Sequence, residues 1–206
     1  MRDRSSPAAP SPRQGALDLD GVIYACATAP EERTARKAGL SAALIGLSGN
    51  RGLPAGRLVS FGLAGGLHDG LACGDVLDAT RVVDADGNVL WEGGPLGVRG
   101  ARDGTILAAS RIVDDPAERR RLHEKTGADA VDMESGPLAQ CGRLAGCLRV
   151  VSDTPSRTLG PLSRALRPDG SVRWNIVADV AAAPLHTARA LRDIRRALRR
   201  LEEAAA

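Results

Sequence analysis

Apolar and polar positions form two kinds of segment along this chain. Short apolar runs bounded by glycine, proline or charged residues are typical of strands buried on both faces. Longer mixed segments that start with proline and acidic residues are typical of helices. We therefore expect strands over 22–27, 42–47, 57–61, 75–83, 89–91, 106–109, 130–135 and 148–151. We expect helices over 30–39, 116–126 and 136–144 and from residue 172 onward.

This order of elements predicts an α/β protein. Strands that alternate with helices build a mixed, mostly parallel central sheet with helices on both faces, which is a three-layer αβα sandwich. Asp86-Gly87 is a hairpin-turn sequence, so the two strands beside it are expected to be antiparallel. Residues 1–19 are polar and proline-bearing and are expected to form a disordered tail ahead of a single domain over 20–206.

Composition and charge narrow the class of protein. The 206 residues are 43% hydrophobic and 26% charged, as in soluble globular domains, and the formal net charge is only +3. Only 2% are aromatic, which argues against a nucleic-acid partner held by base stacking. The four cysteines form no C-x-x-C pair and the three histidines are isolated, so neither a metal site nor a disulfide framework is expected. Because no signal segment and no apolar run of about 18 residues is present, we expect a cytoplasmic protein.

The last predicted helix combines an apolar stripe with many arginines. Its apolar residues recur every three or four positions, at Leu185, Ala188, Leu191, Ile194, Leu198 and Leu201. Its basic residues are Arg189, Arg192, Arg195, Arg196, Arg199 and Arg200. Such a helix either packs on the sheet with a solvated arginine face or lies on anionic lipid. The second interpretation predicts that residues 185–203 contact the inner face of the membrane.

Four motifs that could carry chemistry follow predicted strands. The segment Gly62–Gly66 offers backbone amides to an anion or a ribose. Glu134 can accept hydrogen bonds from two sugar hydroxyls, and a desolvated Asp153 can protonate a leaving group. Glu31 follows the first strand and could act as a base. Each motif has a simpler alternative as a turn, a helix cap or a dipole partner, but together they predict one site at the ends of separate strands.

These motifs resemble those of the nucleoside phosphorylase and nucleosidase superfamily, which includes methylthioadenosine/S-adenosylhomocysteine nucleosidase. The resemblance rests on Val131–Ser135, on Leu148–Asp153 and on the Gly62–Gly66 segment, and it covers residues 21–203. The segment Ala29–Arg36, the short chain and the arginine-rich end resemble more closely the hopanoid-associated phosphorylases, the branch that cleaves adenosylhopane.

The resemblance implies a phosphorylase- or hydrolase-like fold and cleavage of the N-glycosidic bond of an adenosine-type nucleoside. The implied substrate is adenosylhopane, with release of adenine in hopanoid biosynthesis. Asp153 would protonate or hydrogen-bond N7 of the purine. Glu31 would orient the nucleophilic water in a hydrolase, or the sugar and phosphate region in a phosphorylase, although Glu32 is an equally available neighbour. The substrate-binding residues would be Met133, Glu134, Ser152, Ile112, Val113, Gly62, Ala64 and Gly65.

The same resemblance implies no cofactor, with inorganic phosphate as an optional co-substrate, and a homo-oligomer is expected. Leu63 stands where many relatives have Ser or Thr, and Ile112 stands where relatives often have an aromatic residue. The missing hydroxyl leaves phosphorolysis and hydrolysis both open. The alternative enzyme is a soluble methylthioadenosine/S-adenosylhomocysteine nucleosidase. A second alternative is a non-catalytic nucleoside- or membrane-binding protein on the same fold.

Overall fold

The computed structural model describes residues 21–165, 167 and 177–206. The tail expected over 1–19 lies outside these residues, as does the stretch 172–176 at the start of the last expected helix. The strands are β1 (Val22–Cys26), β2 (Ala42–Leu44), β3 (Arg57–Gly66), β4 (Val76–Val83), β5 (Val89–Glu92), β6 (Arg102–Ala108), β7 (Ala130–Asp132) and β8 (Leu144–Asp153). The helices are α1 (Ala29–Lys37), α2 (Pro116–Thr126), α3 (Ser135–Gln140), α4 (Val177–Ala182) and α5 (Pro184–Ala205), with 3-10 turns η1 (Leu47–Gly49) and η2 (Gly160–Arg164).

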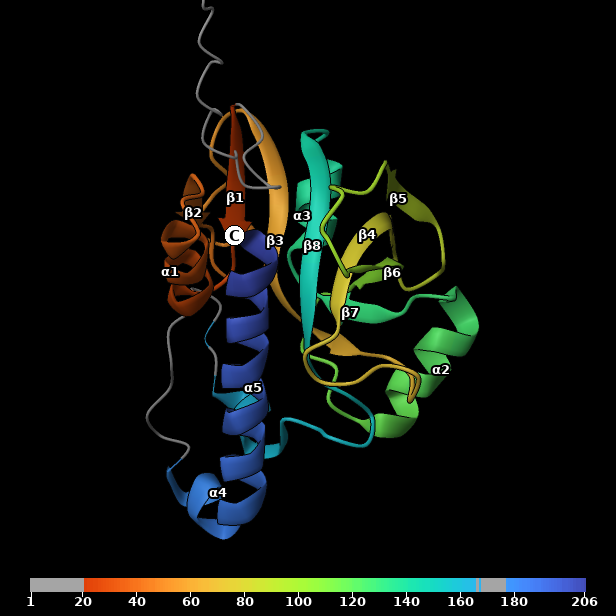
Figure 1. The fold of residues 1–206 in the computed structure, drawn as a ribbon. Coiled ribbons are helices and arrows are strands. Elements are labelled where there is room, and N and C mark those ends of the chain that lie inside the picture. The colour runs from red at the N-terminus through yellow and green to blue at the C-terminus, as the bar shows by residue number, and fades with distance from the viewer. Residues whose placement is uncertain (1–20, 166, 168–176) are drawn as a thin grey trace, which may run out of the picture.

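The strands form one mixed sheet that curls back on itself (Figure 1). β3 pairs with β8 and β7, β4 pairs with β8 and β6, and β6 pairs with β7, so these five strands close a ring. β1 and β2 extend the sheet from β3, and β5 adds the antiparallel hairpin to β4. Five of these eight strand pairings are parallel, which confirms the mixed, mostly parallel sheet expected from the sequence.

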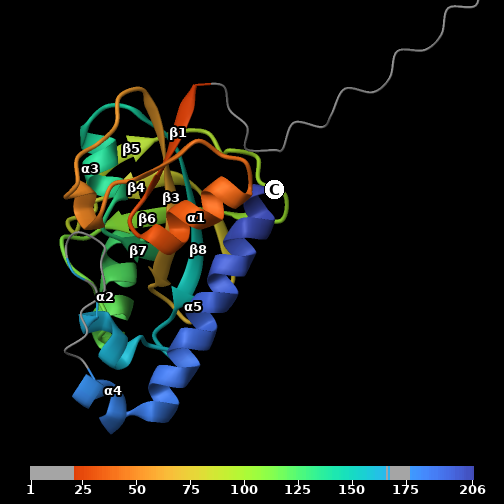
Figure 2. The same ribbon diagram turned by 90° about the vertical axis from the view of Figure 1, so that its left-hand side faces the viewer.

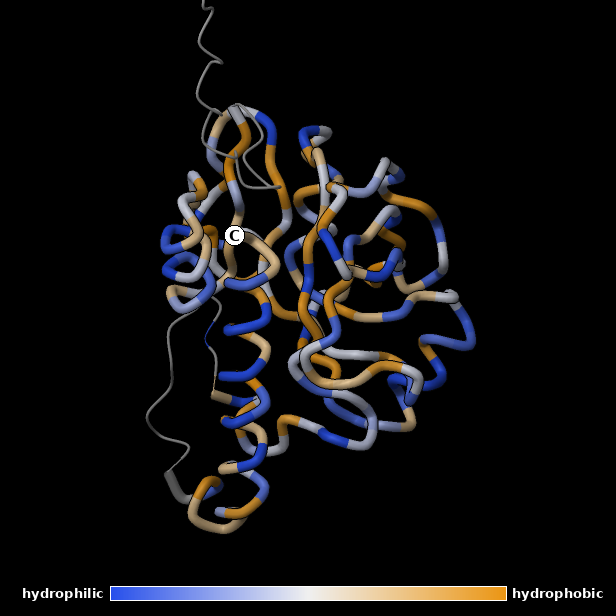
Figure 3. The backbone as a smooth tube through the Cα atoms, in the orientation of Figure 1, coloured by the Kyte–Doolittle hydropathy of each residue, from blue (hydrophilic) through white to orange (hydrophobic). Residues whose placement is uncertain are grey.

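Helices cover both faces of the sheet, as expected for a three-layer sandwich. In Figure 2, α5 runs along one side of the sheet and α3 lies on the other. One buried cluster joins Tyr24 and Phe61 to Leu201 of α5, and a second joins Cys147 to Leu138 of α3. Figure 3 shows the apolar character of the strands between these layers. A third buried cluster joins Leu107 of β6 and Val131 of β7, with Leu122 of α2 packed against it.

Local sequence signals set the helix boundaries. The α2 helix begins where the Asp115 carboxylate accepts a hydrogen bond from the Glu118 amide at 2.7 Å, and it ends at Gly127, whose φ is 68°. Glycine adopts this left-handed backbone conformation without the strain that most side chains would bring, so Gly127 favours a helix stop here. The observed bounds of α2 are those predicted from the sequence.

Several predicted elements differ from the structure at their ends. β3 runs on to Gly66 instead of ending at residue 61, because β8 continues to pair with it along the glycine segment. β8 begins at Leu144, so the helix expected over 136–144 is shortened to α3. The strand expected over 130–135 ends at Asp132, whose carboxylate accepts the Ser135 amide and so starts α3. The strand expected over 42–47 ends at Leu44 and is followed by η1.

Candidate active site

A cavity of about 330 Å³ lies where several strands end. Its walls come from the carboxyl ends of β1, β7 and β8, from the last part of β3, from the loop after β6, and from η2 and α5. The carboxyl ends of strands are where α/β proteins commonly place their ligand sites. Of the ten residues predicted for the site, nine line the cavity: Glu31, Ala64, Gly65, Ile112, Val113, Met133, Glu134, Ser152 and Asp153.

Gly62 is the exception, and the glycine segment has a different use from the one expected. Gly62 does not line the cavity; a Cβ there would lie 2.4 Å from Glu31 Oε1 and 2.8 Å from Arg149 Nη1. A Cβ on Gly65 would lie 3.2 Å from both Arg119 Nη2 and Asp153 Oδ2. These glycines leave room for charged side chains to pack against β3. We expected a loop whose amides hold an anion; the segment is a strand instead.

Glu31 is buried at the start of α1 and is held by three hydrogen bonds. Its Oε1 accepts from the Leu63 amide at 2.8 Å, and its Oε2 accepts from the amide and the hydroxyl of Thr28 at 2.8 and 2.7 Å. Glu32 turns to the surface and pairs with Arg36 at 2.9 Å. The sequence left open which of the two glutamates belongs to the site. In the structure Glu31 lines the cavity and Glu32 does not.

Arg149 is the buried cation beside a second set of carboxyl groups, those of Asp132 and Glu134. This arginine is fully buried in β8 and forms an ion pair with Asp132 at the end of β7. Its Nη2 also lies 3.7 Å from Glu134 Oε2. Asp132 accepts the Ser135 amide at 3.1 Å, so the helix-cap role proposed as its simpler alternative applies to Asp132. Glu134 makes no such cap and faces the cavity.

The environment of Glu134 favours its protonated form. Burial raises the pKa of Glu134 to about 8, and the carboxylates of Asp132 and Glu31 act in the same direction, while Arg149 opposes them. The amide of Ser48 donates to Glu134 Oε1 at 3.2 Å. A carboxyl group poised in this way can change its protonation state near neutral pH, which is typical of functional sites.

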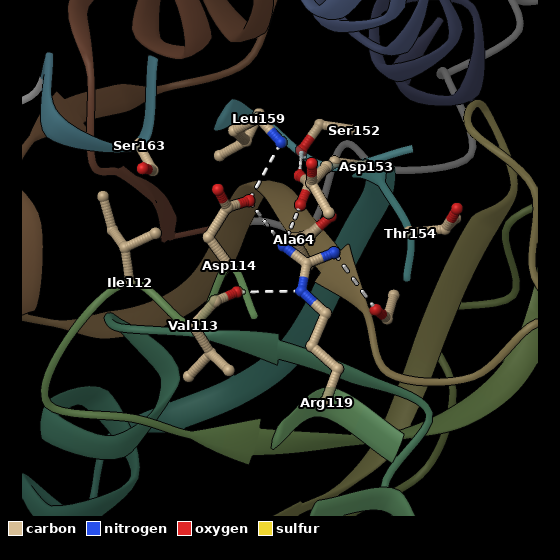
Figure 4. A network of polar contacts seen from close by, with 12 residues as sticks. Ala64, Ile112, Val113, Asp114, Arg119, Ser152, Asp153, Thr154, Leu159 and Ser163 are labelled. Atoms are coloured by element: carbon tan, nitrogen blue, oxygen red, sulfur yellow. Dashed lines mark hydrogen bonds and ion pairs between the residues drawn. The ribbon is translucent and has the colours of Figure 1, made fainter. Parts of the chain in front are cut away.

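Asp153 belongs to a polar network around Arg119, shown in Figure 4. The Ser152 hydroxyl donates to Asp153 Oδ1, and the guanidinium of Arg119 forms an ion pair with Oδ2. Arg119 is itself buried and donates from Nε to the Val113 carbonyl at 2.8 Å. Burial raises the pKa of Asp153, while Arg119 and the Ser152 hydroxyl lower it. Arg119 therefore stabilises the carboxylate that would remain after Asp153 gave up a proton.

The same network reaches the turn that covers part of the cavity. Asp114 lies 3.6 Å from Arg119 Nη2, and its carboxylate accepts the amides of Leu159 and Gly160 at 2.9 and 3.0 Å. Leu159 and Leu162 of this turn line the cavity. Asp114 thus fixes an apolar part of the wall to the arginine that contacts Asp153 (Figure 4).

The remaining wall is mostly apolar. Six of its side chains come from η2 and its flanks and from α5: Leu159, Leu162, Ala165, Leu191, Ile194 and Leu198. The α5 members belong to the apolar stripe recognised in the sequence. The cavity therefore joins four carboxyl groups to a hydrophobic surface, which suits a ligand with one polar and one apolar part.

Arg119, Arg149 and Asp114 are the site residues that sequence reasoning missed. Arg149 carried a signal, because a charge between Leu148 and Val150 in a buried strand must find a partner. Arg119 carried none: it is the first of three consecutive arginines, and the other two are exposed. Among residues 21–165, 167 and 177–206, no group of three His, Cys, Asp or Glu side chains could hold a metal ion.

The sequence and the fold of this chain are similar to those of known proteins. Residues 96–168 match the family model described as "Phosphorylase superfamily". The chain also superimposes on a methylthioadenosine/S-adenosylhomocysteine nucleosidase from Neisseria meningitidis, with a TM-score of 0.53 and 20% identity, covering 86% of this chain and 99% of the other. This is the fold of the phosphorylase superfamily. No curated protein sequence matches the chain.

Two further structures share the phosphorylase-superfamily fold with this chain. The methylthioadenosine/S-adenosylhomocysteine nucleosidase from Helicobacter pylori gives a TM-score of 0.54 at 15% identity, covering 89% of this chain and 96% of its own. The futalosine hydrolase of Helicobacter pylori gives a TM-score of 0.52 at 14% identity, covering 84% of this chain and 96% of its own.

None of the helices that the structure describes is long and apolar enough to cross a membrane.

Proposed function

We propose that this protein is an enzyme that cleaves the N-glycosidic bond of an adenosine-type nucleoside and releases adenine. The observation that carries the proposal is the convergence of Glu31, Glu134 and the Ser152–Asp153 pair on one cavity at the strand ends. Glycosidic cleavage of a nucleoside needs an acid for the base and negative charge near the sugar, and this cavity offers both.

Each buried group has a step that suits it. As the bond between C1′ and N9 breaks, its electron pair moves into the purine, and Asp153 gives its proton to N7. Arg119 stabilises the carboxylate that remains. Glu134 accepts hydrogen bonds from the ribose hydroxyls, and the negative charge of Glu31 favours the cationic sugar of the transition state. A water or phosphate oxygen then bonds to C1′, and in hydrolysis the released proton passes to Glu31.

For the substrate, we propose adenosylhopane. The apolar wall from η2 and α5 supports a nucleoside with a large hydrophobic 5′ substituent. The resemblance of Ala29–Arg36 to the hopanoid-associated branch supports the same choice. A soluble methylthioadenosine/S-adenosylhomocysteine nucleosidase is the second candidate, favoured by the structural likeness to nucleosidases of that name.

An assay of adenine release distinguishes the two candidate substrates. The protein is incubated with adenosylhopane, methylthioadenosine, S-adenosylhomocysteine and adenosine, each with and without phosphate, and adenine is followed by chromatography. Release from adenosylhopane at the highest kcat/KM supports the first candidate, and preference for the sulfur-bearing nucleosides supports the second. Thermal stabilisation by a nucleoside without any adenine release would contradict the enzyme proposal.

The variant Asp153→Asn tests the acid. It keeps the shape of the side chain but cannot donate a carboxyl proton, so we expect adenine release to fall by about 10²–10⁴-fold. Circular dichroism of the variant checks that the fold is retained. Full activity of Asp153→Asn would show that Asp153 is not the acid.

A further inference from the structure

A basic groove lies between α1 and α5, next to the cavity. Its lining residues are Pro30, Arg33, Thr34, Lys37, Arg195, Leu198, Arg199 and Glu202, and its volume is about 430 Å³. Pro30 and Leu198 line both the groove and the cavity. The groove and the cavity therefore meet at these two residues, on the side of the molecule where α1 packs against α5 (Figure 2).

The groove has an excess of positive charge. Four cationic side chains line it, against the single carboxylate of Glu202, which lies 3.7 Å from Lys37 Nζ. Within the part of the chain that the structure describes, Arg33, Arg195 and Arg199 form no ion pair. An anion that binds among these side chains would offset the repulsion between their like charges.

Exposed apolar side chains accompany these arginines on α5. Leu185 is 87% exposed and Leu191 is 38% exposed, and Leu191 also lines the cavity. Figure 3 shows hydrophilic and hydrophobic positions alternating along the length of α5. Helices that lie in the interface of an anionic membrane combine arginine with exposed leucine in this way, because the arginine stems are apolar and their heads reach the phosphates.

We propose that α5 and the basic groove bind the surface of an anionic lipid bilayer. Phosphates of the lipid headgroups lie among Arg33, Lys37, Arg195 and Arg199, and the exposed leucines enter the apolar boundary. A bilayer fits better than a nucleic acid, because leucine contributes nothing to binding a phosphate backbone. Bound in this way, the protein holds its cavity beside the membrane, where a nucleoside with an apolar 5′ chain can enter from the lipid. That last step rests on the proposed function, whereas lipid binding itself does not.

Vesicle sedimentation of the full chain tests this surface. We expect the protein to sediment with vesicles of phosphatidylcholine mixed with phosphatidylglycerol and to stay in solution with phosphatidylcholine alone. Each cationic side chain near an anionic membrane contributes about fivefold in binding, so Arg195→Ser/Arg199→Ser should lower the partition coefficient by about 30-fold. The matched control Arg120→Ser/Arg121→Ser removes two exposed arginines from α2 and should leave it unchanged.

Three outcomes would overturn the proposal. They are equal sedimentation with both kinds of vesicle, an equal loss in the two double variants, and binding to duplex DNA without binding to vesicles. Adenine release from a soluble nucleoside, measured without vesicles, keeps the two proposals apart. Arg195→Ser/Arg199→Ser should retain this activity, and a protein that binds vesicles but releases no adenine contradicts the proposed function alone.

Discussion

Two buried arginines govern the acidic part of the cavity. Arg119 pairs with Asp153, and Arg149 pairs with Asp132 and lies near Glu134. Removing a charge from water is expensive, so a buried ion pair adds little to the stability of a fold compared with apolar side chains of the same volume. Two such pairs beside one cavity indicate that these charges serve the site rather than the core.

Arg119→Met should destabilise the protein by leaving Asp153 buried without its counter-ion. We expect the free energy of unfolding to fall by about 3–5 kcal/mol. Burial already raises the folded-state pKa of Asp153, and that pKa rises further without Arg119. The pH-dependent part of the loss in the variant therefore grows as pH rises above the raised pKa of Asp153 in the unchanged protein. Urea unfolding at acidic and at neutral pH measures this. Arg119→Met/Asp153→Asn should recover most of the loss, and a double variant as unstable as Arg119→Met would contradict the pairing.

Glu134→Gln should stabilise the protein at alkaline pH. The pKa of Glu134 is about 8 in the folded state against an ordinary 4.5, so the folded state binds more protons and stability falls as pH rises through this window. A glutamine does not ionise, so the gain in the free energy of unfolding is absent below the lower end of the window and reaches about 2–5 kcal/mol at its upper end, since one pKa unit corresponds to about 1.4 kcal/mol. Thermal unfolding across this range gives the answer, with Glu32→Gln on the surface as the control. A lower melting temperature at the upper end would contradict the raised pKa.

The turn η2 is joined to the rest of the site through one carboxylate. Asp114 accepts two amides of this turn and also lies beside Arg119. No regular secondary structure provides these hydrogen bonds, so the position of Leu159 and Leu162 in the cavity wall depends on this side chain. The apolar part of the cavity is therefore held in place by a polar contact.

Asp114→Ala should loosen this wall without touching the reacting groups. We expect KM for the preferred nucleoside to rise by about tenfold, because two amides lose a charged acceptor, while kcat changes little. Asp84→Ala is the matched control, since Asp84 accepts the amides of Asp86 and Asn88 in the β4–β5 hairpin, away from the cavity. An unchanged KM in Asp114→Ala, or an equal rise in both variants, would show that Asp114 does not position the wall.

The helix α5 takes part in the core, the cavity and the basic groove at once. One face carries the buried residues Ala190, Ala197 and Leu201, which pack toward the sheet. The next face lines the cavity with Leu191, Ile194 and Leu198, and the groove residues Arg195 and Arg199 follow. Both interpretations of the arginine-rich helix drawn from the sequence are thus compatible: packing on the sheet is observed, and membrane contact stays a prediction.

Leu201→Ala measures how far the whole fold depends on this packing. Leu201 is fully buried in the cluster between α5 and the sheet, so its truncation leaves a cavity and should lower the free energy of unfolding by about 2–5 kcal/mol. Leu185→Ala removes the same atoms from an exposed position of the same helix and should change stability by less than about 0.5 kcal/mol. Equal effects in urea unfolding would mean that α5 does not stabilise the core.

The sequence by itself determined the class of the fold and the main elements. The apolar runs that became β1, β4, β6 and β8, and the capping signals of α2, depend on neighbouring residues, so their pattern is visible in one dimension. The polar residues at strand ends were also visible, and nine of the ten predicted site residues line one cavity, where the carboxyl ends of β1, β7 and β8 come together.

Only the tertiary structure decided which charges are buried and what they contact. It selected Arg119 from three consecutive arginines and Glu31 from two adjacent glutamates, and it placed Gly62 behind the site instead of in it. It also closed five strands into a ring. The reason is that the desolvation of a charge and the choice of a strand's partner depend on contacts between distant positions, such as Arg119 with Asp153, 34 residues apart. Local periodicity contains no record of such contacts.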